Sequence, residues 1–145
     1  MRNAKGRVFH SAGVEDTVAI GLEIGAKLKD NYIVGLIGEL GAGKTVIARG
    51  IVRAFLGIGD DPVRSPTFAI MNVYSSGEKK VYHFDLYRIK DMNDLESTGY
   101  REFSASGGVS LVEWPDRLKE VLEDCDIIVE IREGEDGNSR VISVR

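Results

Sequence analysis

A cluster of glycines followed by a lysine and a threonine carries the clearest chemical signal in the chain. Gly38 is followed by four residues and then by Gly43, Lys44 and Thr45, which is the complete pattern of a phosphate-binding P-loop. Glycines let backbone N–H groups approach a phosphate without intervening side chains. In such loops the lysine contacts the β- and γ-phosphate oxygens, and the threonine hydroxyl binds Mg²⁺. The pattern predicts a nucleotide-binding loop.

The segments on either side of this loop have the pattern that the loop requires. Residues 33–37 form a short apolar run, typical of a buried parallel strand. Apolar residues then recur at helical spacing from Val46 to Phe55. A helix that begins near Lys44 places the positive end of its dipole at the phosphate site. This context favours a P-loop over a glycine-rich turn that binds nothing.

Two carboxylates are candidates for work at the phosphate end of the nucleotide. Glu113 follows the apolar run 109–112, and a carboxylate at such a strand end reaches Mg²⁺ or orients the attacking water in P-loop proteins. His83, Asp85 and Tyr87 alternate along another expected strand and so share one face. Asp85 either completes the Mg²⁺ shell, positions water or only pairs with Arg88.

Two further residues have both a functional and a structural interpretation. Thr67 lies in a loop at residues 65–67, where P-loop switch proteins place a threonine that senses Mg²⁺ and the γ-phosphate. The alternative is an ordinary proline-containing turn. Trp114 directly follows Glu113 and is either a packing anchor or an aromatic side chain that senses the site.

The remaining elements are expected in the following order. Residues 7–10 form a short strand, and a helix starts at Ser11, which caps it, with Val14, Val18 and Leu22 on its apolar face. Strands at 67–74 and 81–87 make an antiparallel hairpin, and a short helix at 91–98 ends at Gly99. Residues 127–131 and 141–144 make a second hairpin at the sheet edge. We expect one α/β domain over residues 1–145, a P-loop NTPase-like fold with a mixed parallel and antiparallel sheet flanked by helices.

Composition limits the class of protein. The chain has 145 residues, 43% of them hydrophobic, enough for the core of one domain. Its net charge of −4 argues against a free-standing nucleic-acid binder. Cys125 is the only cysteine, so a disulfide within the chain is excluded. We see neither a signal peptide in residues 1–10 nor an apolar run near the roughly 18 residues that span a bilayer, and expect a soluble cytoplasmic protein without membrane contact.

The pattern leaves the nucleotide and the reaction partly open. There is no Asn-Lys-x-Asp sequence, which reads guanine in GTPases, so ATP is favoured by elimination. A small-molecule kinase would need a lid with arginines, and no long arginine-rich insertion is present. A nucleotide-gated binding module with negligible turnover is the other alternative.

At this point the chain resembles the bacterial TsaE (YjeE) family, the small P-loop ATPases needed to make threonylcarbamoyladenosine on tRNA. The resemblance covers the chain from about Ser11 to its end. It rests on four blocks in the family's order, at residues 38–45, 63–68, 83–88 and 112–117. The last three, containing Ser-Pro-Thr-Phe, His-Phe-Asp-Leu-Tyr-Arg and Glu-Trp-Pro, are highly specific together. Glu39 and Val46 are mild departures, where Asp and Thr are expected.

The resemblance implies a set of roles and partners. Thr45 and Glu113 would bind Mg²⁺, Thr67 would act as the switch threonine, and Asp85 would be required for hydrolysis. TsaD and TsaB would be the protein partners, with tRNA reached through their complex and ATPase activity weak without it. Lys44, Thr67, Asp85 and Glu113 are the expected catalytic residues. The expected nucleotide contacts are Gly38, Glu39, Leu40, Gly41, Ala42, Gly43, Lys44, Thr45, Val46 and Trp114.

Overall fold

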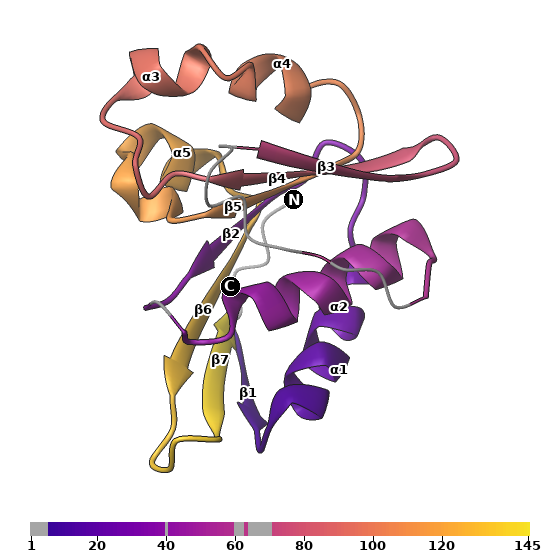
Figure 1. The fold of residues 1–145 in the computed structure, drawn as a ribbon, viewed down its shortest axis with the longest axis vertical. Coiled ribbons are helices and arrows are strands. Elements are labelled where there is room, and N and C mark those ends of the chain that lie inside the picture. Colours follow the sequence, from indigo (N-terminus) through magenta and orange to yellow (C-terminus); the bar gives the residue numbers. More distant parts are fainter. Residues whose placement is uncertain (1–5, 40, 60–62, 64–70) are drawn as a thin grey trace.

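In the part of the chain that the computed structural model describes, residues 6–39, 41–59, 63 and 71–145, seven strands form one sheet with helices on both faces (Figure 1). The strands are β1 (Arg7–Ser11), β2 (Ile33–Ile37), β3 (Met71–Ser76), β4 (Lys79–Asp85), β5 (Val109–Glu113), β6 (Ile127–Glu133) and β7 (Arg140–Val144). The helices are α1 (Val14–Gly25), α2 (Lys44–Leu56), α3 (Met92–Glu96), α4 (Tyr100–Ser104) and α5 (Lys119–Asp124), with a 3₁₀ turn η1 (Pro115–Arg117) before α5.

The strand order places the two chemically important strands side by side. The order is β1-β7-β6-β2-β5-β4-β3, and β2 is parallel to both β5 and β6. β4 is parallel to β5. At one edge β3 pairs antiparallel with β4, and toward the other edge β7 pairs antiparallel with both β6 and β1. The carboxyl ends of β2, β5 and β4 therefore meet at one edge of the sheet, where ligands bind in open α/β sheets. This confirms the predicted mixed sheet.

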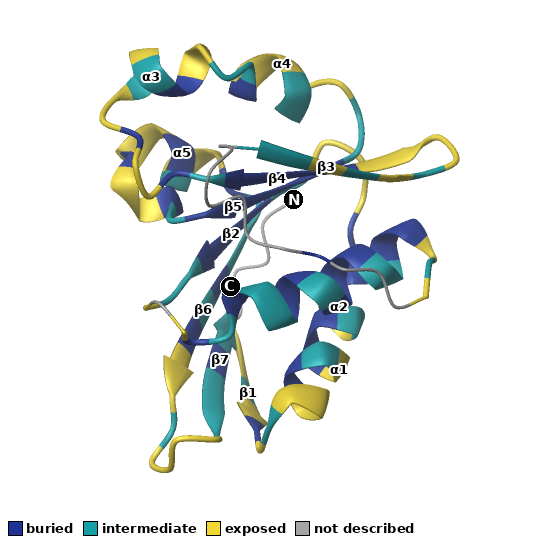
Figure 2. Ribbon diagram, viewed as in Figure 1, coloured by how far each residue is buried: buried dark blue, intermediate teal, exposed yellow. Residues whose placement is uncertain are grey.

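Each face of the sheet buries its own hydrophobic cluster (Figure 2). Helices α1 and α2 cover one face, and α3, α4 and α5 cover the other (Figure 1). Along β5, Val109 and Leu111 pack toward α2, whereas Val112 packs toward α5. Glu113 is two residues beyond Leu111, so alternation turns its side chain to the α2 face.

The buried face of α1 differs from the predicted one. Val14 is 60% exposed, whereas Ile20, Gly21 and Ile24 are buried against α2. The reason is a close approach of the two helix backbones: a Cβ atom on Gly21 would lie 2.4 Å from the carbonyl oxygen of Ile47. The prediction followed the spacing of apolar side chains and took no account of glycine as a packing residue.

The two predicted hairpins exist, but one lies elsewhere in the sheet. β3 and β4 pair as expected, although residues 67–70 of the predicted first strand are outside the described residues. The prediction that β6 and β7 form the sheet edge was wrong. β6 pairs with β2 through residues 127–130, and β1 adds on the outer side of β7, so β1 is the edge strand.

Two helix boundaries also differ from prediction. Ser11 is the last residue of β1 and not a helix cap, because α1 begins at Val14 and its N-cap is Gly13. The Ser11 hydroxyl instead forms a hydrogen bond of 2.7 Å with the hydroxyl of Thr17. Gly99 separates two helices, since its left-handed backbone (φ 85°) is the N-cap of α4, which the sequence analysis missed.

None of the helices in the described residues is long and apolar enough to cross a membrane.

Candidate functional site

The glycine loop lies between the end of β2 and the start of α2, as predicted. Gly41 and Gly43 have φ values of 79° and 112°, a region that favours glycine. The loop is tightened by the N–H of Ala42, which donates to the Glu39 carbonyl at 3.0 Å. α2 starts at Lys44 without a side-chain cap. Its first turn therefore presents backbone N–H groups and a positive dipole end.

Lys44 is held inside the site. Its side chain is only 6% exposed, and its amine donates to the carbonyl of Gly38 and lies 4.0 Å above the centre of the Trp114 ring. Burial lowers the pKa of the Lys44 amine, while Glu113 and Asp85 oppose that shift by favouring the charged form. The lysine, both carboxylates and the tryptophan thus converge at one place, although they come from three parts of the sequence.

Glu113 is fixed by a buried hydrogen-bond chain. It is 2% exposed, and its Oε2 lies 2.7 Å from Nε2 of His83, which is fully buried. The Nδ1 of the same imidazole lies 3.3 Å from the hydroxyl of Tyr74. A neutral imidazole that carries its proton on Nε2 satisfies both contacts, because it donates to the carboxylate and accepts from the hydroxyl. His83 was noted in the sequence for its strand face, but its role as the partner of Glu113 was missed.

Asp85 is the next carboxylate along the sheet edge. It is the register partner of Glu113 between β4 and β5, so both carboxylates lie on the same face. Its Oδ1 accepts from the N–H of Tyr87 at 2.9 Å. Burial raises the pKa of Asp85 and the charge of Glu113 adds to the shift, whereas the Tyr87 N–H, His83 and Lys44 oppose it. The alternative in which Asp85 only pairs with Arg88 finds no support, because that pair is not among the ion pairs of the described residues.

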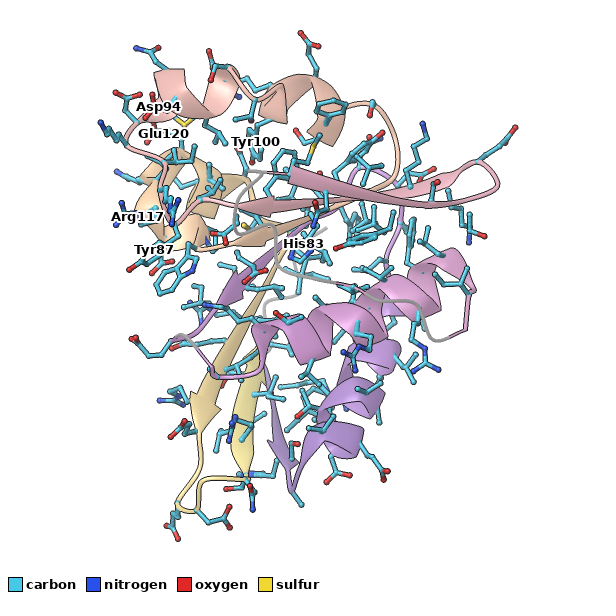
Figure 3. The ribbon with its side chains drawn as sticks, in the orientation of Figure 1. His83, Tyr87, Asp94, Tyr100, Arg117 and Glu120 are labelled. Atoms are coloured by element: carbon cyan, nitrogen blue, oxygen red, sulfur yellow. The ribbon has the colours of Figure 1, made fainter. Side chains whose placement is uncertain are left out.

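Trp114 joins the site to an aromatic surface. Its backbone is left-handed (φ 60°), which is uncommon for a bulky residue and often marks a functional position. The Tyr87 ring lies 5.1 Å from the Trp114 ring, and the Arg117 guanidinium lies 5.9 Å from the centre of the Tyr87 ring. Figure 3 shows Tyr87 and Arg117 together beside α5, away from His83 in the interior.

A hollow of about 520 Å³ opens on the other side of the loop, toward β6. Its walls come from the end of β2 and the loop, the segment after β5, and the last four residues of β6. They are Ile37, Gly38, Glu39, Ala42, Trp114, Asp116, Glu130, Ile131, Arg132 and Glu133. The loop thus has the Glu113 and Asp85 carboxylates on its β5 side and, on its β6 side, an open hollow whose walls also include acidic residues.

The structure brings most of the predicted site residues together. Thr45 and Val46 occupy the first turn of α2 and are half-buried. Leu40 and Thr67 lie outside the described residues. A residue that the sequence analysis missed is Arg140, whose Nε donates to the carbonyl of Ala42 at 2.7 Å.

The oxygen donors present suit Mg²⁺ shared with a phosphate. Among the described residues there is no group of three or more His, Cys, Asp or Glu side chains that could hold a metal. Glu113 and Asp85 instead supply two carboxylates at this edge, and Thr45 supplies a hydroxyl group in the first turn of α2. Mg²⁺ in nucleotide sites is commonly bound by one or two carboxylates together with phosphate oxygens and water, so the donor set fits this ion.

Comparison with known proteins agrees with the fold and the motifs. The family model described as threonylcarbamoyl adenosine biosynthesis protein TsaE matches residues 11–142. The tRNA threonylcarbamoyladenosine biosynthesis protein TsaE of Aquifex aeolicus is 38% identical over 90% of this chain and 89% of its own. The protein of the same name from Haemophilus influenzae is 40% identical over 68% of this chain, and the match spans only 61% of that relative's length.

A solved structure is similar over nearly the whole chain. The crystal structure of Bacillus subtilis YdiB superposes with a TM-score of 0.77 and 28% sequence identity, covering 99% of this chain and 87% of that one. The family match, the identities and the shared fold lead to the same conclusion: this chain belongs to the TsaE family, which is named for threonylcarbamoyladenosine biosynthesis.

Proposed function

We propose that this chain binds ATP with Mg²⁺ and hydrolyses it as a subunit of the cytoplasmic machinery that makes threonylcarbamoyladenosine on tRNA. The observation that carries the proposal is the convergence of Lys44, Glu113 and Asp85 at the start of α2. A cation and two carboxylates beside an uncapped helix N-terminus can bind a phosphate chain and its metal ion.

The phosphates would lie on the backbone N–H groups of the glycine loop and on the first turn of α2. Lys44 would exchange its present partners, the Gly38 carbonyl and the Trp114 ring, for phosphate oxygens. Both present partners are weaker acceptors for an ammonium group than an anionic oxygen, so the exchange favours nucleotide binding.

The carboxylates would act at the terminal phosphate. Thr45 and Glu113 would hold Mg²⁺, which supplies positive charge to stabilise the transferring phosphoryl group. Asp85 would help to position water, fixed by the N–H of Tyr87. His83 would keep the Glu113 carboxylate in one orientation. Thr67 remains the predicted switch threonine, and Leu40 remains a predicted loop contact.

The sugar and base would occupy the hollow toward β6. This assignment follows from the sheet order, because the carboxylates of β5 and β4 take the opposite side of the loop and the terminal phosphate must face them. Trp114 lines the hollow and also touches Lys44, so it would contact the nucleotide near its middle. The absence of the guanine-reading Asn-Lys-x-Asp sequence favours ATP over GTP.

The partners we propose are TsaD and TsaB, with tRNA reached only through the complex. Residues 1–145 would act as one domain in that complex. The support is the family membership together with a negative net charge of −4, which is unfavourable for direct binding to a nucleic-acid backbone.

The test is Mg²⁺-dependent ATP hydrolysis by the purified protein, first alone and then with TsaD and TsaB. We expect slow turnover alone, a clear rise with both partners, and loss of the activity in the Lys44→Ala variant. Phosphate transfer to an added small molecule instead of water would favour the kinase alternative. ATP binding without turnover under either condition would favour the gated module.

A further inference from the structure

One arginine connects the β6–β7 hairpin to the glycine loop. Arg140 is the first residue of β7, and its Nη1 donates to the carbonyls of Gly137 and Ser139 at 2.9 and 2.8 Å. Its Nε donates to the carbonyl of Ala42 at 2.7 Å, and its Nη2 lies 3.5 Å from that of Gly41. The guanidinium therefore joins two backbone segments 98 residues apart in the sequence.

The contact with Ala42 has a consequence for the next peptide N–H. The described backbone has no cis peptide bonds, and in a trans peptide the carbonyl of one residue points opposite to the N–H of the next. When Arg140 holds the Ala42 carbonyl toward the hairpin, the N–H of Gly43 is directed away from it. Gly43 is the glycine just before Lys44, where a P-loop uses backbone N–H groups to bind phosphate.

The positive charge of Arg140 lies next to the glycine loop, on the side of the β6–β7 hairpin. A Cβ atom on Gly43 would lie 4.0 Å from Nε of Arg140, so the cation is in contact distance of the loop backbone. Guanidinium groups stay charged at all physiological pH values. Arg140 has two acidic neighbours, both exposed: Asp136, which accepts N–H groups of Asn138 and Ser139 within its own turn, and Glu133, its register partner on β6. Neither forms an ion pair with Arg140 among the described residues. Arg140 thus contributes positive potential where a phosphate would bind.

We propose that Arg140 is a positioning residue for phosphate binding. It fixes the Ala42–Gly43 peptide so that the Gly43 N–H faces the phosphate, and it adds positive charge behind the loop. This inference rests on the proposed nucleotide-binding function and extends it to a residue outside the P-loop. The competing explanation is that Arg140 only stabilises the turn between β6 and β7 and has no effect on phosphate binding.

The experiment compares three variants by calorimetric titration with MgADP. Arg140→Gln should weaken MgADP binding by about tenfold to a hundredfold. This is the range expected when a charge-assisted hydrogen bond is lost and the Ala42–Gly43 peptide is no longer held in place. Arg140→Lys keeps the charge but cannot bridge the two segments, so its affinity should lie between those of Arg140→Gln and wild type. Arg101→Gln is the matched control, because Arg101 lies on α4, is 58% exposed and pairs with the exposed Glu96; its affinity should stay within about twofold of wild type.

A second measurement separates positioning from general stability. In the nucleotide-free protein, the amide resonance of Gly43 should shift in Arg140→Gln and stay in place in Arg101→Gln. If Arg140→Gln lowers only the melting temperature and binds MgADP like wild type, Arg140 only stabilises the turn between β6 and β7 and the inference is wrong. If wild type itself does not bind MgADP, the proposed function fails, and the inference fails with it.

Discussion

Replacing His83 by leucine should reveal how strongly the buried imidazole supports Glu113. The imidazole is fully buried, and its Nε2 lies 2.7 Å from Oε2 of a carboxylate that is 2% exposed. Leucine keeps a buried side chain of similar bulk but removes the hydrogen-bond donor. The carboxylate then loses a partner in a place where water cannot easily replace it.

The expected cost follows from the type of bond that is lost. A hydrogen bond to a charged group contributes about 1.5–3 kcal/mol to stability. With a urea m-value of about 2 kcal/mol/M, the unfolding midpoint should fall by about 0.75–1.5 M. Equilibrium urea unfolding, followed by circular dichroism, measures this shift directly.

The control is a double-mutant cycle with Glu113→Gln. A neutral amide presents no charge to the imidazole, so His83→Leu should cost at least about 1 kcal/mol less in the Glu113→Gln background. If His83→Leu costs the same in both backgrounds, or less than about 0.5 kcal/mol in wild type, the imidazole does not support the carboxylate and the reasoning is refuted.

Three further predictions follow from other parts of the structure. Gly21→Ala should destabilise the protein by about 1–3 kcal/mol in urea unfolding, because its Cβ would lie 2.4 Å from the Ile47 carbonyl; a gain of up to about 1 kcal/mol, as at an unhindered helical glycine, would contradict this packing. Burial raises the pKa of the Tyr100 hydroxyl, so the native state keeps this proton above pH 10 while the unfolded state loses it, and stability falls as pH rises. Tyr100→Phe should therefore move the alkaline unfolding midpoint to higher pH, and an unchanged midpoint would argue against this source of alkaline sensitivity. Trp114 is the only tryptophan, and its ring centre lies 4.0 Å from the Lys44 amine. If MgATP draws this amine to its phosphates, Trp114 fluorescence should change saturably with MgATP. A constant signal, despite binding seen by calorimetry, would show that Lys44 stays on the Trp114 ring.

Much of the framework could be predicted because neighbouring residues encode it. The apolar run of β2, the glycines and the apolar face of α2 are contiguous, so the loop and its flanking elements followed from local patterns. The strand that ends at Glu113 was recognised in the same way. Its membership of the same sheet was predicted because P-loop proteins hold the metal ion between the loop hydroxyl and a second acidic residue. Its position directly beside β2 comes from the structure.

The missed features depend on contacts between distant segments. The buried face of α1 is set by how closely Gly21 approaches α2, and apolar spacing carries no information on such an approach. The position of β6 inside the sheet depends on its pairing with β2, about 90 residues earlier in the sequence. Arg140 follows a polar turn, and nothing in that turn indicates that its guanidinium reaches the carbonyl of Ala42.

Calorimetric titration of the purified chain with ATP and Mg²⁺, in wild type and in Lys44→Ala, tests the proposed nucleotide site most directly. We expect one saturable site in wild type and binding at least about tenfold weaker in Lys44→Ala, because the variant lacks the amine that would contact the phosphates. Lys27→Ala, which removes an exposed lysine on the surface after α1, should bind like wild type. Equal affinity in wild type and Lys44→Ala would contradict the proposed site, since the nucleotide would then bind somewhere other than the loop before α2.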